Sequence, residues 1–195
     1  MATLTHDNKY ACAFELTLSA WERYSPKKGN SNIETVPSGE PYTLWVEYRM
    51  ALQIGDRILY QSQKDTTLVL EDTRVLIENL RQLANGNKDR LAFDPIEPDF
   101  GLNIRNLTES DATVMISSAA EIRADMPTAA VNRSTEPVDV FDVNVWIDHP
   151  NQVDRFYGGY GPGLYFFVEA NDIVRFADKL QEELDGLGSY FSVGK

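Results

Sequence analysis

Apolar and polar residues alternate with a period of two in several segments of the sequence, and this pattern limits the fold more than any other feature. Between residues 42 and 53 the apolar positions are Tyr42, Leu44, Val46, Tyr48, Met50 and Leu52. Residues 11–21 and 138–148 alternate in the same way. A period of two predicts strands that bury one face. Gly55 and Asp56 form a turn signal, which predicts that residues 57–63 return as a hairpin partner.

Two segments change to helical spacing. Residues 71–85 repeat apolar side chains at Val75, Leu76, Leu80, Leu83 and Ala84, and Asn85-Gly86 is a typical C-terminal stop. Residues 171–184 repeat them at Ile173, Phe176, Ala177, Leu180 and Leu184. Several strands precede each helix, which favours antiparallel pairing. The expected fold class is α+β: an antiparallel β-sheet, curved or in two layers, with both amphipathic helices packed on its apolar face.

The two helical segments align with each other at a constant offset. Leu68, Asp72, Leu76 and Leu80 match Val168, Asp172, Phe176 and Leu180 at a separation of 100 residues. This spacing suggests an internal duplication, with similar halves at 10–99 and 100–190 inside one domain that spans 1–195. Any two amphipathic helices can also be aligned by sliding, so chance matching stays open.

Negative charge dominates the chain, with 30 acidic and 18 basic residues and a net charge of −12. Residues 100–195 hold 15 acids and 7 bases, a net of −8, whereas residues 1–99 hold 15 acids and 11 bases, a net of −4. Such a surface repels nucleic acid and attracts a basic protein, although it also serves plain solubility.

The sequence also bears on where the protein acts. No apolar run is long enough to span a membrane, and the first residues lack a basic segment followed by an apolar one. We therefore expect a cytoplasmic protein that does not bind membranes, whereas the oligomeric state stays open.

Residues suited to metal binding or covalent catalysis are scarce. Cys12 is the only cysteine, and His6 and His149 are the only histidines. No pair of metal ligands at zinc-site spacing and no nucleophile elbow occurs. The glycine-rich segment 157–163 precedes a strand and lacks a nearby lysine, unlike a phosphate-binding loop. The sequence therefore predicts no metal, no cofactor and no catalytic residue.

The strand at 138–148 carries the best candidate for a binding surface. If Val143, Val145 and Ile147 face the core, then the outward residues are Asp142, Asn144, Trp146 and Asp148. An exposed tryptophan among carboxylates is typical of a protein interface with a basic partner. Tyr157 and Tyr160 in the glycine-rich segment are added as contact residues. Alternatively, a helix or a second sheet covers Trp146, and likewise Trp45.

The segment from Tyr42 to Arg105 resembles the WapI-type bacterial immunity proteins. The matching features are Tyr-Thr-Leu-Trp-Val-Glu-Tyr at 42–48, the helical stretch at 70–80, the Ala-Asn-Gly stop and the acidic, proline-containing stretch at 93–98. The closing strand and helix at 163–187 fit the same plan. The resemblance implies a non-enzymatic protein that neutralises a contact-dependent toxin.

The leading hypothesis is thus an immunity protein that binds a basic toxin through an acidic, aromatic surface. A second hypothesis is a small-molecule-binding protein or an enzyme, with a cleft between sheet and helices near Asp94, Glu97, Tyr157 and Tyr160. A third is a structural accessory subunit.

Overall fold

Nine strands and two helices make up the part of the chain that the computed structural model describes, which is residues 1–6, 12–23, 44–62, 65–95, 100–107, 139–147 and 163–190. The strands are β1 (Ala2–Thr5), β2 (Cys12–Arg23), β3 (Leu44–Ile54), β4 (Arg57–Gln61), β5 (Asp65–Val69), β6 (Arg90–Phe93), β7 (Phe100–Asn106), β8 (Val140–Ile147) and β9 (Gly163–Glu169). The helices are α1 (Leu70–Ala84) and α4 (Ala170–Tyr190).

The strands form two antiparallel sheets. Sheet A has five strands in the order β1-β2-β3-β4, and β5 also pairs with β3. Sheet B has four strands in the order β6-β7-β8-β9. Each strand of sheet B pairs with its neighbour in the sequence, as consecutive strands commonly do. The expected α+β fold with an antiparallel, two-layer sheet is confirmed.

Local chemistry explains where α1 begins and ends. Glu71 and Asp72 lie in its first turn, where carboxylates interact favourably with the helix dipole. At its end the Gly86 N–H donates to the Leu83 carbonyl and the Asn87 N–H donates to the Gln82 carbonyl. This pattern needs a left-handed residue after the helix, and Gly86 has a φ of 71°. The predicted stop is therefore confirmed.

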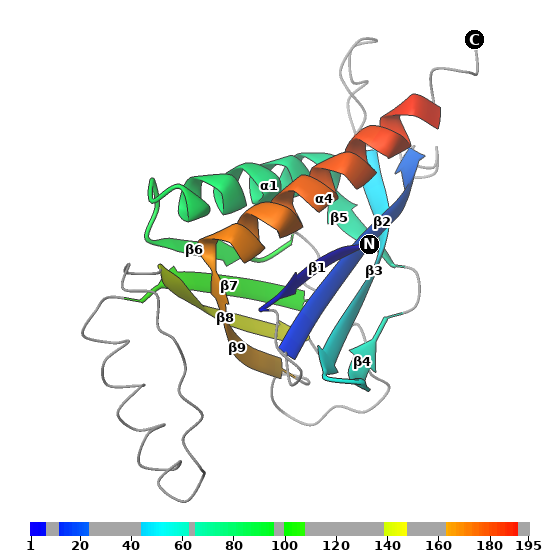
Figure 1. Ribbon diagram of the computed structural model, residues 1–195. Helices are drawn as coiled ribbons and strands as arrows, with labels where there is room; N and C mark the ends of the chain where they lie inside the picture. Colours follow the sequence, from blue (N-terminus) through cyan, green and yellow to red (C-terminus); the bar gives the residue numbers. More distant parts are fainter. Residues whose placement is uncertain are drawn as a thin grey trace, which may run out of the picture.

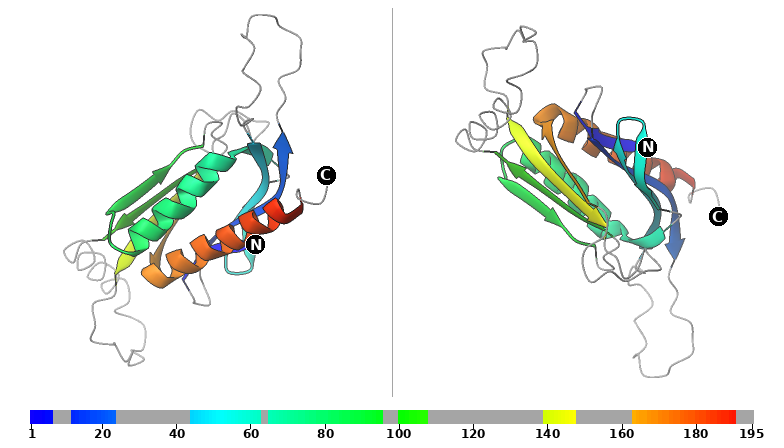
Figure 2. Two further views of the ribbon diagram at one scale, coloured as in Figure 1. Left: turned by 90° about the horizontal axis from the view of Figure 1, so that it is seen from above. Right: turned by 90° about the horizontal axis from the view of Figure 1, so that it is seen from below.

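The two helices run side by side and in opposite directions over the two sheets (Figures 1 and 2). α4 packs on β1 and β2 of sheet A, whereas α1 packs on β5 of sheet A and β6 of sheet B. Between the helices, the Arg81 guanidinium pairs with Asp178 at 3.0 Å. Both helices thus close the same core, as the sequence predicts.

A continuous apolar cluster fills the space between the sheets and the helices. At its centre Phe14 of sheet A meets Phe100 of sheet B, with ring centroids 5.7 Å apart. Phe176 of α4 lies 5.9 Å from Phe14. Among the residues that the alternation and the helical spacing place inside, Val46, Leu76, Leu80, Val145, Phe166, Phe176 and Leu180 are buried.

Other expectations differ from the structure or lie outside its described part. The short strands β1, β5 and β6 were not expected, because stretches of four or five residues show too little alternation. Alternation between Val114 and Ile122 also predicts a strand, and the compositions of 25–41 and 125–137 predict loops. These segments and the side chain of Leu44 lie outside the described residues.

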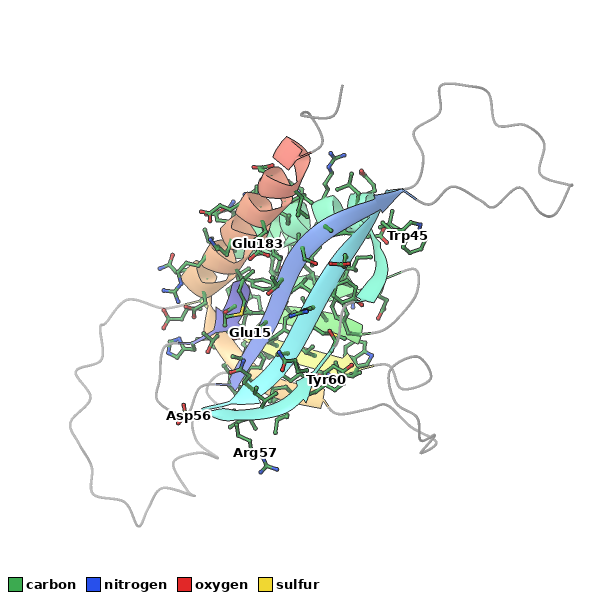
Figure 3. All side chains as sticks on the ribbon, turned by 90° about the vertical axis from the view of Figure 1, so that its right-hand side faces the viewer. Glu15, Trp45, Asp56, Arg57, Tyr60 and Glu183 are labelled. Atoms are coloured by element: carbon green, nitrogen blue, oxygen red, sulfur yellow. The ribbon has the colours of Figure 1, made fainter. Side chains whose placement is uncertain are left out.

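The outer face of sheet A is turned toward the viewer in Figure 3. Trp45 lies at one end of β3, and the β3–β4 hairpin with Asp56 and Arg57 lies at the other end. Glu15 of β2 is a polar residue of this face. The Trp45 side chain has intermediate exposure, and its Nε1 atom is buried.

Candidate functional site

The strand β8 carries the predicted partner-binding residues that the structure describes. Phe141, Val143, Val145 and Ile147 point into the core and are buried. Asp142, Asn144 and Trp146 therefore point away from the core, as the alternation predicts. The other three predicted contact residues, Asp148, Tyr157 and Tyr160, lie outside the described residues.

The strand register brings residues from β7 and β9 beside those of β8. Asp142 lies between Arg105 and Phe167, Asn144 lies between Asn103 and Tyr165, and Trp146 lies between Gly101 and Gly163. Residues directly opposite in antiparallel strands have Cβ atoms about 5 Å apart and share one face of the sheet. We name this surface the outer face of sheet B, defined by Asn103, Arg105, Asp142, Asn144, Trp146, Tyr165 and Phe167.

The Asp142 carboxylate is paired with an arginine of the neighbouring strand. Its Oδ2 atom accepts hydrogen bonds from Nη2 and Nε of Arg105, at 2.8 and 3.2 Å. The Asp142 side chain is only 13% exposed, whereas the Arg105 side chain is 55% exposed. The negative charge that the sequence offers for a basic partner is thus compensated within the sheet.

Asp142 also acts on the neighbouring tyrosine. Partial burial is the largest influence that raises the pKa of the Tyr165 phenol, and the charge of Asp142 and a hydrogen bond to it raise this pKa further. Arg105 acts in the opposite direction. Arg105, Asp142 and Tyr165 therefore form one connected polar group across three strands.

The Trp146 indole lies over Gly101 of β7. A Cβ atom added to Gly101 would be 2.0 Å from Cζ2 of the Trp146 indole, so only glycine fits beneath the ring. The indole is half-buried in this position and is covered by neither helix. Gly101 therefore decides the orientation of Trp146, because any side chain there would occupy the same space.

Tyr165 and Phe167 on β9 are the residues of this face that our sequence reasoning missed. Tyr165 is 49% exposed and Phe167 is 39% exposed. Their rings meet edge to face, with centroids 5.3 Å apart and planes at 80°. The signal was present in the sequence, because Leu164, Phe166 and Val168 are the buried members of an alternating strand. Tyr165 and Phe167 alternate with them, so the same count places both rings outward.

A second polar cluster ties α4 to sheet A. Asp172 is buried, and its Oδ2 atom accepts the Glu169 N–H at 2.9 Å and lies 3.2 Å from Nδ1 of His6. Its Oδ1 atom pairs with Arg175. These contacts join the end of β1 to the start of α4, where a carboxylate at the third position receives the capping N–H. Both carboxylate oxygens of Asp172 therefore have partners within the fold.

Glu183 is likewise structural. The sequence places it on the surface of a helix, but its side chain is only 11% exposed. Its Oε2 atom accepts the Leu18 N–H at 2.9 Å, next to the register shift between Leu18 and Ala20 in β2. A bulge leaves backbone groups without a partner in the ladder, and Glu183 satisfies one of them.

The candidates for a metal site, a reactive thiol and a ligand cleft have few supporting features among the described residues. No group of three or more His, Cys, Asp or Glu side chains there is placed to hold a metal ion. Burial raises the pKa of the Cys12 thiol, which disfavours the reactive thiolate. Of the residues proposed for a cleft, Asp94 is exposed, and Glu97, Tyr157 and Tyr160 lie outside the described residues.

Neither α1 nor α4 has the length and apolar character that a membrane-crossing helix requires.

Comparisons with known proteins give one match. The model of the immunity protein WapI-like family matches residues 4–188. No curated protein and no solved structure matches the chain. The family match covers nearly all of the chain and includes both sheets and both helices.

Proposed function

The chain belongs to the WapI-like immunity protein family, and from this premise we propose that it is a cytoplasmic, non-enzymatic protein that neutralises a bacterial toxin by binding it. The family resemblance drawn from the residues is confirmed by the match to residues 4–188. An immunity role implies a protein partner. The remaining question is which surface receives that partner.

The outer face of sheet B is the observation that carries this proposal. It presents Trp146, Tyr165 and Phe167 together on the two regularly paired strands β8 and β9. Tryptophan and tyrosine dominate the binding energy of protein interfaces, and clustered exposed rings mark interaction sites. Around them, Asn103 and Asn144 are exposed and offer amide donors and acceptors. Such a mixture of rings and amides suits a protein partner.

The net charge of −12 supports a basic toxin as the partner. Opposite charge accelerates the diffusional encounter and is screened by salt. At the cytoplasmic ionic strength this attraction acts over about 8 Å. Charge therefore contributes to the rate of association, and the rings contribute to the lifetime of the complex.

The test first identifies a gene next to that of this chain whose product stops growth, and it then uses the toxin domain of that product. Expression of the domain alone should stop growth, and co-expression of this chain should restore it. With purified proteins, the toxin activity should fall linearly with added chain and reach its minimum at one equivalent. Stoichiometric titration is expected because a binder is consumed, whereas an enzyme would act at far below one equivalent.

Two outcomes would contradict the proposal. Absence of a complex between the purified proteins would remove the immunity role for this toxin. Protection by a small fraction of an equivalent would show that the chain acts as an enzyme.

A further inference from the structure

Tyr165 and Phe167 are the exposed aromatic side chains of the described residues. Both belong to β9, which pairs with β8 over seven positions without a register shift. Trp146 on the same face lies over Gly101 and is less exposed. The two β9 rings are therefore more exposed than Trp146, and we call this pair the aromatic projection.

The projection is held in place before any partner arrives. The edge-to-face contact at 5.3 Å fixes the two rings relative to each other. The Tyr165 phenol is tied to Asp142, and Arg105 fixes Asp142 from the other side. Rings carried on a regular strand and supported in this way lose little conformational entropy on binding.

The outer face of sheet B is close to electrically neutral. Among the described residues, the register gives this face and its continuation to the ends of the strands four charged side chains, Arg90, Arg105, Asp142 and Glu169, two of each sign. The acidic character of the chain is therefore not concentrated where the rings project. A neutral aromatic projection is complementary to an uncharged, apolar concavity rather than to a row of lysines and arginines.

We propose that the Tyr165–Phe167 pair is a preformed projection that inserts into an apolar pocket of the toxin domain. This inference rests on the proposed function, since it names how that partner is held. Trp146, beside the pair on the same face, contacts the rim of the pocket. Asp142 is a positioning residue for Tyr165. Attraction by the acidic surface elsewhere brings the partners together, and the two rings retain the toxin.

The experiment measures binding kinetics between the purified toxin domain from the neighbouring gene and two double variants. The first is Tyr165→Ala with Phe167→Ala. The second is the matched control Ile54→Ala with Ile58→Ala, which removes exposed apolar side chains (42% and 53%) from the β3–β4 hairpin of sheet A. Circular dichroism and thermal melting check folding. If the first variant unfolds, Tyr165→Thr with Phe167→Thr replaces it, because threonine suits a strand.

We expect the β9 variant to raise Kd by about 30-fold or more, almost entirely through the dissociation rate. The salt dependence of its association rate should equal that of the wild type, because no charge is removed. The hairpin control should bind within about twofold of the wild type.

The outcomes separate the two proposals. If the wild type binds and the β9 variant binds equally well, the projection is wrong and the immunity role stands. An equal loss in the β9 variant and in the hairpin control would also overturn the projection. If the wild type itself does not bind the toxin domain, the proposed function fails, and the projection fails with it.

Discussion

The two sheets have similar topologies, in which consecutive antiparallel strands lead into a helix, but they differ in how their strands are arranged. In the first half β1, β2 and β3 pair in sequence, and β4 and β5 share the far side of β3 before the chain enters α1. In the second half β6, β7, β8 and β9 pair in sequence, and β9 runs directly into α4. The buried positions of the helices match at the offset of 100 residues, as at Leu76 and Phe176 or Leu80 and Leu180.

The helices do not stay with their own halves. α4 packs on β1 and β2 of the first half, and α1 reaches β6 of the second half. Each half thus covers part of the apolar face of the other. The internal duplication stays a prediction, although this repeated topology is what a duplication would leave. Because β6 pairs with β7, the boundary between the two similar halves falls between α1 and β6 in the structure. The sequence pattern places this boundary near residue 99.

The outer faces of the two sheets show where the halves differ. Each central strand carries an outward tryptophan, Trp45 in β3 and Trp146 in β8. The next two residues of β3 on the same face as Trp45 are the charged residues Glu47 and Arg49. Trp146 instead shares its face with two exposed rings on β9. The comparison teaches that similar frameworks support different surfaces: among the described residues the exposed aromatic rings lie on sheet B, whereas sheet A exposes Ile54 and Ile58.

The largest expected effect tests the equivalence of the helices. Leu80→Ala and Leu180→Ala should each lower the free energy of unfolding by about 2–5 kcal/mol, because both side chains are fully buried at matching positions. Denaturant melts measure the change. Val75→Ala, at an exposed position of α1, is the control and should stay within about 0.5 kcal/mol. Losses under about 1 kcal/mol at both leucines would mean that the helix faces are wrongly assigned.

The next effect separates the two tryptophans. Trp146→Ala should weaken toxin binding by about 2 kcal/mol or more through a faster dissociation rate. Trp45→Ala, the equivalent change on sheet A, should leave binding unchanged. Surface plasmon resonance with the purified toxin domain measures both, after each variant has been shown to fold. Unchanged kinetics for a folded Trp146→Ala variant would remove Trp146 from the contact surface.

A smaller effect concerns the seat of the indole. Gly101→Ala places a Cβ atom where Trp146 now lies, so the ring must move. We expect a loss of about 1–3 kcal/mol in stability from the displaced ring, together with weaker binding. Gly186→Ala is the matched control, because nothing lies within 4 Å of its added Cβ on α4. It should stabilise the protein by up to about 1 kcal/mol. A Gly101→Ala variant as stable as the wild type would show that the indole relocates freely.

The smallest effect tests the polar group on sheet B. Asp142→Asn removes the charge and weakens the hydrogen bond that raise the Tyr165 pKa, so this pKa should move down toward its ordinary value. Spectroscopic pH titration detects the change, and Tyr165→Phe identifies which tyrosine responds. Stability should change by no more than about 1 kcal/mol, as for other surface ion pairs. The association rate with a basic toxin should fall slightly and become less sensitive to salt. An unchanged Tyr165 pKa would show that Asp142 does not position this ring.

The sequence alone determined the elements whose signals are local. Alternation assigned the inward and outward faces of β3 and β8, and helical spacing located α1 and α4. The Asn85-Gly86 stop was readable because a left-handed residue after a helix needs glycine there. The outward placement of Asp142, Asn144 and Trp146 followed from the same count, since successive side chains on a strand point to opposite faces.

Tertiary structure decided everything that depends on which strands become neighbours. Arg105 neutralises Asp142 from 37 residues away, and Gly101 makes room for Trp146 on an adjacent strand. His6 and Asp172 meet across 166 residues. Strand register fixes these pairs, and register results from the packing of the whole apolar face rather than from either strand alone. For that reason the sequence supplied an acidic strand with a tryptophan, and the fold converted it into a neutral aromatic surface.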